Sequence, residues 1–144
     1  MIGYHGSDKT ITTIHTGTGA GLYITPDHAA AHAYAYATAH KANSTGTPTV
    51  HTLTLADTAN IATYWDADPI IDEAAEHPAT GFDRDDYSYW ALIEMTEIRD
   101  ALAEAGYDGI HLDDTTPDGD DHTSILVWNT ELLTITHVIT LTAA

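Results

Sequence analysis

The chain has 144 residues, no cysteine, and 22 acidic against 4 basic residues, which gives a formal net charge of -18. The lack of cysteine excludes disulfides, thiolate metal sites and a cysteine nucleophile, and the negative charge disfavours general binding of nucleic acids, whose phosphates attract lysine and arginine. Because the chain has neither an apolar run of the roughly 18 residues that span a bilayer nor a secretory signal pattern, we expect one cytoplasmic domain over residues 1–144, with no membrane contact.

The first third of the chain predicts two strands followed by a helix. Residues 2–6 form a short strand, residues 7–21 form a Thr- and Gly-rich loop with a turn of strand at residues 10–14, and residues 22–25 form a second strand. A helix is expected over residues 27–41, with Thr25 as its cap and Pro26 at its first position. The alanines of this helix leave a small face on which another backbone can pack closely.

The rest of the chain predicts one more helix and four strands. Residues 49–56 alternate as a half-buried strand, residues 57–86 mix short helical turns with loop, and residues 87–106 repeat apolar side chains at helical spacing up to a Gly106 cap. Strands follow at residues 107–112, 124–129 and 132–142, with an acidic turn over residues 113–122 between the first two. This order of elements predicts an α+β fold with a mixed or mostly antiparallel sheet.

Four short motifs occur in a suggestive order. They are "YHGS" at His5, "GLYIT" at Tyr23, "GYDGI" at residues 106–110 and "SILVWN" at residues 124–129. In this order they resemble the ADP-ribosyltransferase-fold domains of phage and bacterial polyvalent proteins, in the group with an H-Y-[E/D/Q] site. The resemblance implies an ADP-ribosyltransferase-like split sheet with two main helices. It also implies mono-ADP-ribosyl transfer from NAD to a protein side chain or small molecule, in a toxin or a phage counter-defence factor.

The resemblance also implies roles for individual residues. His5 would hydrogen-bond the ribose hydroxyls on the adenosine side, and Gly6 would leave room for the ligand. Ser7 would contact ribose or phosphate. Tyr23 would stack on the nicotinamide ring, partly through cation–π attraction.

The resemblance further implies an acidic residue at the start of the late strand, which would bond the 2′-hydroxyl of the nicotinamide ribose. Alignment places Ser124 at that position, and Asp121 and His122 lie just upstream. With one residue of slack in the loop, Asp121 would supply the carboxylate. We therefore predict a catalytic set and an NAD-binding set, and no metal site. The catalytic set is Tyr23, Asp121 and His122; the NAD-binding set is His5, Gly6, Ser7, Tyr23 and Ser124.

Other interpretations stay open. Because Ser124 replaces the acidic residue, the domain could bind NAD or ADP-ribose without catalysis. A rifamycin-type ADP-ribosyltransferase would take its carboxylate from Asp66 or Asp68 in "YWDADP". The chain could also be an acidic inhibitor, whose carboxylates bind a basic partner protein. We read the His28 and His32 pair as coincidence among ten histidines, and "DDTTPDGDDH" as a solvated turn, because it lacks the final glutamate of a calcium loop.

Overall fold

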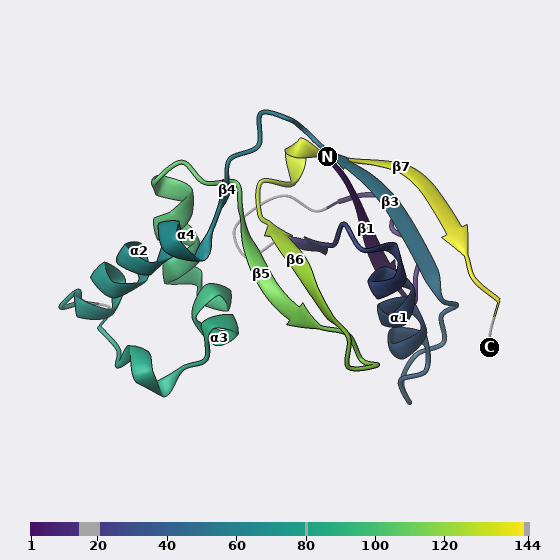
Figure 1. Ribbon diagram of the computed structural model, residues 1–144, viewed down its shortest axis with the longest axis horizontal. Coiled ribbons are helices and arrows are strands. Elements are labelled where there is room, and N and C mark those ends of the chain that lie inside the picture. Colours follow the sequence, from purple (N-terminus) through teal and green to yellow (C-terminus); the bar gives the residue numbers. More distant parts are fainter. Residues whose placement is uncertain (15–20, 80, 143–144) are drawn as a thin grey trace.

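The computed structural model describes residues 1–14, 21–79 and 81–142 and has an α+β fold with two sheets (Figure 1). The first sheet has the order β1-β3-β7 and is antiparallel throughout. The second has the order β2-β6-β5-β4, in which only the short β4–β5 pair is parallel. An isolated bridge between Tyr4 and Thr25 joins the two sheets. The predicted α+β class and the split mixed sheet are confirmed.

The strands are β1 (Ile2–Ser7), β2 (Leu22–Ile24), β3 (Thr49–Leu55), β4 (Ile61–Ala62), β5 (Gly109–Thr115), β6 (Asp121–Val127) and β7 (Leu133–Thr140). The α-helices within the described residues are α1 (His28–Ala39), α2 (Tyr64–Glu76), α3 (Tyr89–Glu94) and α4 (Thr96–Glu104). Two short 3-10 turns, η1 (Arg84–Asp86) and η2 (Thr130–Leu132), complete the order. None of these described helices is both long and apolar enough to cross a lipid bilayer.

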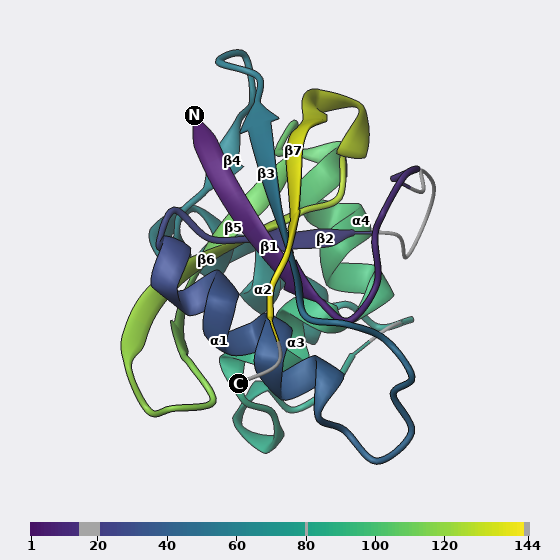
Figure 2. The same ribbon diagram turned by 90° about the vertical axis from the view of Figure 1, so that its right-hand side faces the viewer.

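The second sheet lies between the first sheet and three helices. Alternation along β5 and β6 directs Ile110, Leu112 and Leu126 toward a core shared with α2, α3 and α4. Ile125 and Val127 belong to the opposite core, which contains Leu53 and Leu55 of β3. Figure 1 shows α2, α3 and α4 gathered on one side of β5 and β6, and Figure 2 shows β1, β3 and β7 side by side with α1 close to β1.

Helix α1 packs directly on the backbone of β1. A Cβ atom added to Gly6 would meet the Ala31 carbonyl oxygen at 2.0 Å and the Ala35 nitrogen at 2.7 Å. Ala31 and Ala35 are fully buried at this contact. The predicted small face of the helix is therefore used for close packing, and a glycine is required opposite it.

The N-cap of helix α1 lies two residues after the predicted one. Asp27 is the N-cap, and its carboxylate accepts the Ala30 amide at 3.2 Å. Thr25 instead donates its hydroxyl proton to the Thr123 carbonyl at 2.8 Å and accepts the Asp27 amide at 3.1 Å. The prediction of Thr25 as the cap is wrong, because its hydroxyl ties the end of β2 to β6.

Further local predictions also differ from the structure. Residues 10–14 form no strand, and residues 15–20 of the predicted loop lie outside the described residues. Residues 57–86 are more regular than expected, since a capping box between Thr63 and Asp66 starts the 13-residue helix α2. The single helix predicted over residues 87–106 breaks at Met95, where ψ is 133°, into α3 and α4. The acidic turn shrinks to residues 116–120, because β5 and β6 extend into it.

Candidate functional site

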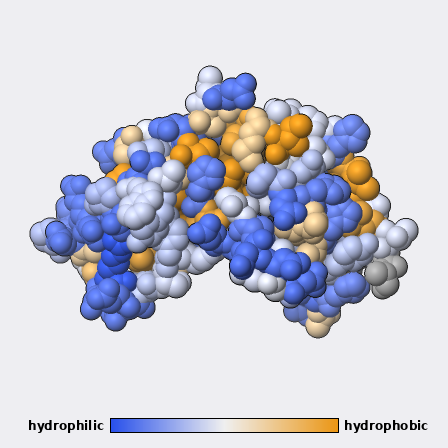
Figure 3. Space-filling view, in the orientation of Figure 1, coloured by the Kyte–Doolittle hydropathy of each residue, from blue (hydrophilic) through white to orange (hydrophobic). Residues whose placement is uncertain are grey.

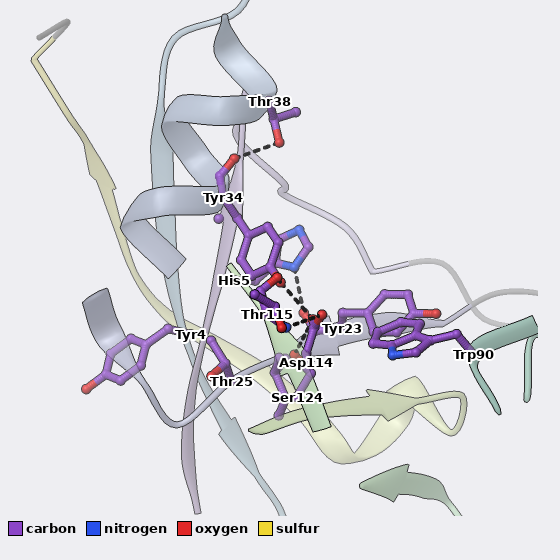
Figure 4. Close-up of a pocket in the computed structure, with 12 residues that line it drawn as sticks. Tyr4, His5, Tyr23, Thr25, Tyr34, Thr38, Trp90, Asp114, Thr115 and Ser124 are labelled. Carbon is purple, nitrogen blue, oxygen red and sulfur yellow. Dashed lines mark hydrogen bonds between the residues drawn. The ribbon is translucent and has the colours of Figure 1, made fainter. Parts of the chain in front are cut away.

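A cavity of about 510 Å³ opens where β1, β2, α1, α3 and the β5–β6 hairpin meet (Figure 4). Its walls combine aromatic rings, hydroxyls and one carboxylate. The lining residues are Tyr4, His5, Gly6, Tyr23, Ile24, Thr25, Tyr34, Thr38, Trp90, Asp114, Thr115 and Ser124. Four of the predicted site residues, from three separate strands, therefore lie in one cavity: His5, Gly6, Tyr23 and Ser124.

His5 is held as a neutral imidazole. Its Nδ1 lies 2.7 Å from the Tyr23 carbonyl oxygen, and because a carbonyl can only accept, Nδ1 carries the proton. Burial lowers the pKa of His5 and outweighs the bond to the Tyr23 carbonyl, which acts in the opposite direction; the nearby His51 lowers the pKa further. The neutral ring keeps Nε2 as an acceptor, which suits a ligand hydroxyl.

Tyr23 forms an aromatic wall with Trp90. The two rings stack with centroids 5.3 Å apart and an interplanar angle of 29°. The Tyr23 hydroxyl donates to Oε1 of Glu94 at 2.8 Å, and burial, reinforced by this carboxylate, raises the pKa of Tyr23. Figure 4 shows both rings on the same side of the cavity. Sequence reasoning assigned Trp90 to a helix without a role at the site, because nothing local indicates that α3 reaches β2.

The carboxylate of the cavity belongs to Asp114, which sequence reasoning missed. Its Oδ2 accepts the Tyr34 hydroxyl at 2.7 Å and the Ser124 hydroxyl at 3.1 Å, and its Oδ1 accepts the Thr115 amide at 2.7 Å. Ser124 thus lies beside a carboxylate from the neighbouring strand. Asp114 was overlooked because residues 113–122 were assigned to a turn. In the structure β5 continues through Asp114 and pairs it with His122.

Three predicted site residues do not line the cavity. Asp121 is exposed and accepts the Thr115 hydroxyl at 3.3 Å. His122 pairs with Asp114 across β5 and β6, and its Nε2 lies 3.0 Å from the Tyr34 hydroxyl oxygen. Ser7 accepts the Lys9 amide at 3.2 Å. Gly6 does line the cavity, but the space left by its missing side chain is filled by α1 and not by a ligand.

The carboxylates considered as alternatives have structural partners outside the cavity. Asp66 belongs to the α2 capping box, and Asp68 pairs with Arg84. The His28 and His32 rings lie 4.4 Å apart, centroid to centroid. Across the described part of the chain, no group of three or more histidine or acidic side chains is placed to hold a metal ion.

Comparison with known proteins adds one match. No protein-family model matches the chain, and no curated protein matches it. Among solved structures, the chain resembles one from the crystal structure of the M. tuberculosis MbcT–MbcA toxin–antitoxin complex. The match covers 99% of this chain and 84% of that chain, with a TM-score of 0.56 and 13% sequence identity. At this identity the similarity establishes that the two chains share a fold.

Proposed function

We propose that this chain binds NAD in the cavity and transfers its ADP-ribose to an acceptor, as a mono-ADP-ribosyltransferase. The observation that carries the proposal is the convergence of a neutral histidine, an aromatic wall and one carboxylate in a single cavity. These groups match what a dinucleotide with two riboses and a flat cationic ring requires. The ordered motifs on the first strands and the late hairpin support the same activity.

Each group has a definable task in this reaction. NAD supplies a nicotinamide leaving group on the ribose C1′ atom. Asp114 would accept the 2′-hydroxyl of that ribose and stabilise the positive charge that develops as the C1′–N bond breaks and its electron pair leaves with nicotinamide. The wall of Tyr23 and Trp90 would hold the pyridinium ring, and Nε2 of His5 would accept a hydroxyl of the other ribose. The acceptor then bonds to C1′ and loses a proton.

Calorimetry and mass spectrometry test this function together. The wild-type protein is expected to bind NAD and to release nicotinamide. Tyr23→Ala should weaken NAD binding by about tenfold, which corresponds to a lost stacking contact of about 1.4 kcal/mol. Tyr64→Ala, which removes an exposed tyrosine from outside the cavity, is the matched control and should bind NAD as the wild type does.

Each result decides between the candidate functions. Binding without nicotinamide release would favour a non-catalytic NAD-binding module. A wild-type protein that neither binds NAD nor releases nicotinamide would contradict the proposal.

A second candidate function rests on a groove at the other end of the molecule. The groove has a volume of about 580 Å³ and lies between α2 and α4; its lining includes Ile70 and three alanines. Glu73, Glu97, Asp100 and Glu104 line it, and no lysine or arginine is among the described residues that line it. We propose that a basic segment of a protein partner binds here. The matched structure, which is a toxin–antitoxin complex, supports a protein partner for this fold.

Two charge-matched variants test this groove. The probe is a helical peptide with lysines flanking a leucine, titrated at low and high salt. The Glu97→Gln, Asp100→Asn, Glu104→Gln variant should lose binding, because its carboxylates line the groove. The Asp118→Asn, Asp120→Asn, Asp121→Asn variant removes the same charge from the exposed hairpin and should bind normally. Equal losses in the two variants would contradict a groove-specific site.

A further inference from the structure

Strand β7 forms an open edge of the first sheet. In the order β1-β3-β7 it pairs with β3 on one side, and no other strand among the described residues pairs with it. Every residue from Thr136 to Thr140 is exposed, and two of them are hydrophobic, Val138 at 40% and Ile139 at 48% exposure. Figure 1 shows β7 at the outer margin of the molecule, on the side opposite α2, α3 and α4. This edge is therefore accessible to another strand.

The edge carries little of the usual protection against pairing. Exposed edge strands commonly contain charged side chains, above all lysine, or proline. None of these residue types occurs in residues 132–144, and β1 and β3 contain no acidic residue, lysine or arginine either. The register with β3 skips Thr136, which is a bulge, but it is regular from His137 to Thr140. Because the chain has a net charge of -18, an uncharged edge is where a second, equally acidic copy meets little repulsion.

Two residues of this regular stretch direct their backbone groups away from β3. The Leu141 amide donates to the Pro48 carbonyl at 2.8 Å and therefore faces β3. In an antiparallel pair, residues alternate between those that bond to the neighbouring strand and those that do not. The amide and carbonyl groups of Ile139 accordingly face β3, whereas those of Val138 and Thr140 face outward.

We propose that the chain forms a homodimer in which β7 pairs antiparallel with β7 of a second copy, with Ile139 on the two-fold axis. In this register Val138 of each copy lies opposite Thr140 of the other, and both pairs exchange N–H···O bonds through their outward-facing groups. Ile139 meets its counterpart in the close, non-hydrogen-bonded position, so that each exposed side chain is buried against an identical one. The two first sheets then join into one continuous sheet.

The outward-facing groups favour this register over its neighbours. With Val138 on the axis, Thr140 would have to pair with Thr136, which lies at the bulge. With Ile139 on the axis, all the opposed side chains are β-branched, and such pairs stabilise antiparallel strands. The same surface patch serves both copies, as a two-fold interface requires.

The dimer leaves the cavity accessible. No residue of β7 is among those that line the cavity, so the inference does not depend on the proposed function. A contact of one strand pair belongs to the small class of interfaces, and we therefore expect a weak dimer that forms at high protein concentration.

The lack of cysteine permits a cross-linking test of the register. Ile139→Cys should form a disulfide-linked dimer under mild oxidation, because Cα atoms in such a pair lie about 4.5 Å apart, within the span of a disulfide. His137→Cys, which is also exposed on β7, is the matched control. In the proposed register its two cysteines lie more than about 13 Å apart and should stay reduced. No cross-link at position 139, or equal cross-linking at both positions, would contradict the register.

Analytical ultracentrifugation tests whether the unmodified chain associates. At about 100 μM protein and high salt, which screens the repulsion between copies, the wild type should contain dimers. Ile139→Lys places two charges on the axis and should weaken association by at least about tenfold. Ile2→Lys is the matched control, because it charges a residue on β1 that is 59% exposed, and it should associate as the wild type does. A wild type that stays monomeric, or equal losses in the two variants, would overturn the proposal and leave the edge to a strand of another protein.

Discussion

The side chains of the cavity are fixed by neighbouring protein groups. His5 bonds the Tyr23 carbonyl, the Tyr23 hydroxyl bonds Glu94, and Asp114 accepts from Tyr34 and Ser124. A site whose polar groups are oriented in advance pays less to reorganise when it stabilises developing charge. This preorganisation is what we expect of a catalytic cavity.

The aromatic wall allows the ring of Tyr23 to be separated from its hydroxyl. Tyr23→Phe removes the bond to Glu94 but keeps the stack on Trp90, so NAD affinity should change little. Trp90→Ala removes the ring behind Tyr23 and should weaken NAD binding by about tenfold. Calorimetric titration of both variants checks this order. If Tyr23→Phe is the more damaging change, the hydroxyl rather than the ring contacts NAD.

At the scale of elements, the contact between β1 and α1 shapes one side of the cavity. Gly6→Ala would drive a methyl group into the α1 backbone at Ala31 and Ala35. We expect a loss of about 1–3 kcal/mol in the free energy of unfolding, typical of an overpacked contact, measured by urea denaturation. Ser7→Ala, at the next residue, is the control and should stay within about 0.5 kcal/mol of the wild type. If Gly6→Ala had the same free energy of unfolding as the wild type, α1 would have to be able to shift away from β1.

The elements differ in how far their sequence predicts them. The strands at His5 and Tyr23 and the alanine-rich helix could be predicted, because their periodicity and breakers are local. The end of β5 could not, because the acidic residues beyond Leu112 favour a turn, and only pairing with β6 extends the strand through Asp114. For the same reason sequence reasoning placed the carboxylate at Asp121, which does not line the cavity, together with His5 and Tyr23, which do. Trp90 and Tyr34 join the cavity through contacts between helices and strands that no local pattern reports.

At the scale of the whole molecule, the acidic surface sets the conditions in which stability can be measured. Figure 3 shows a face that is mostly hydrophilic, with hydrophobic residues restricted to patches. With a net charge of -18, the acidic side chains repel one another. This repulsion extends over a screening length of about 10 Å at 0.1 M salt. Added salt therefore isolates the contributions of individual buried groups.

Two histidines, His51 buried and His5 half-buried, should make the free energy of unfolding depend on pH. Burial lowers the pKa of His5 and of His51, and Nε2 of His51 accepts the Ile11 amide at 2.8 Å, which requires a neutral ring. Because folding lowers these pKa values, the unfolded chain takes up protons at a higher pH than the folded chain does. Their contribution is therefore complete above the ordinary pKa of 6.5 and is lost as the pH falls below it.

Urea denaturation at high salt between pH 7.5 and 5.5 checks this dependence. The free energy of unfolding should fall by up to about 1.4 kcal/mol per pH unit for each proton taken up on unfolding. His51→Gln, which keeps an acceptor for Ile11 but does not titrate, should show a shallower fall. Identical slopes in the wild type and the variant would mean that His51 takes up its proton equally in both states.

The most direct test of the central claim compares two carboxylates seven residues apart. Nicotinamide release from NAD should be followed for the wild type, Asp114→Asn and Asp121→Asn at saturating NAD. Asp114 lines the cavity and Asp121 does not, so we expect Asp114→Asn to slow release by about 10²–10³-fold and Asp121→Asn to match the wild type. Wild-type turnover by Asp114→Asn, or a loss confined to Asp121→Asn, would contradict the assignment of this cavity as the active site.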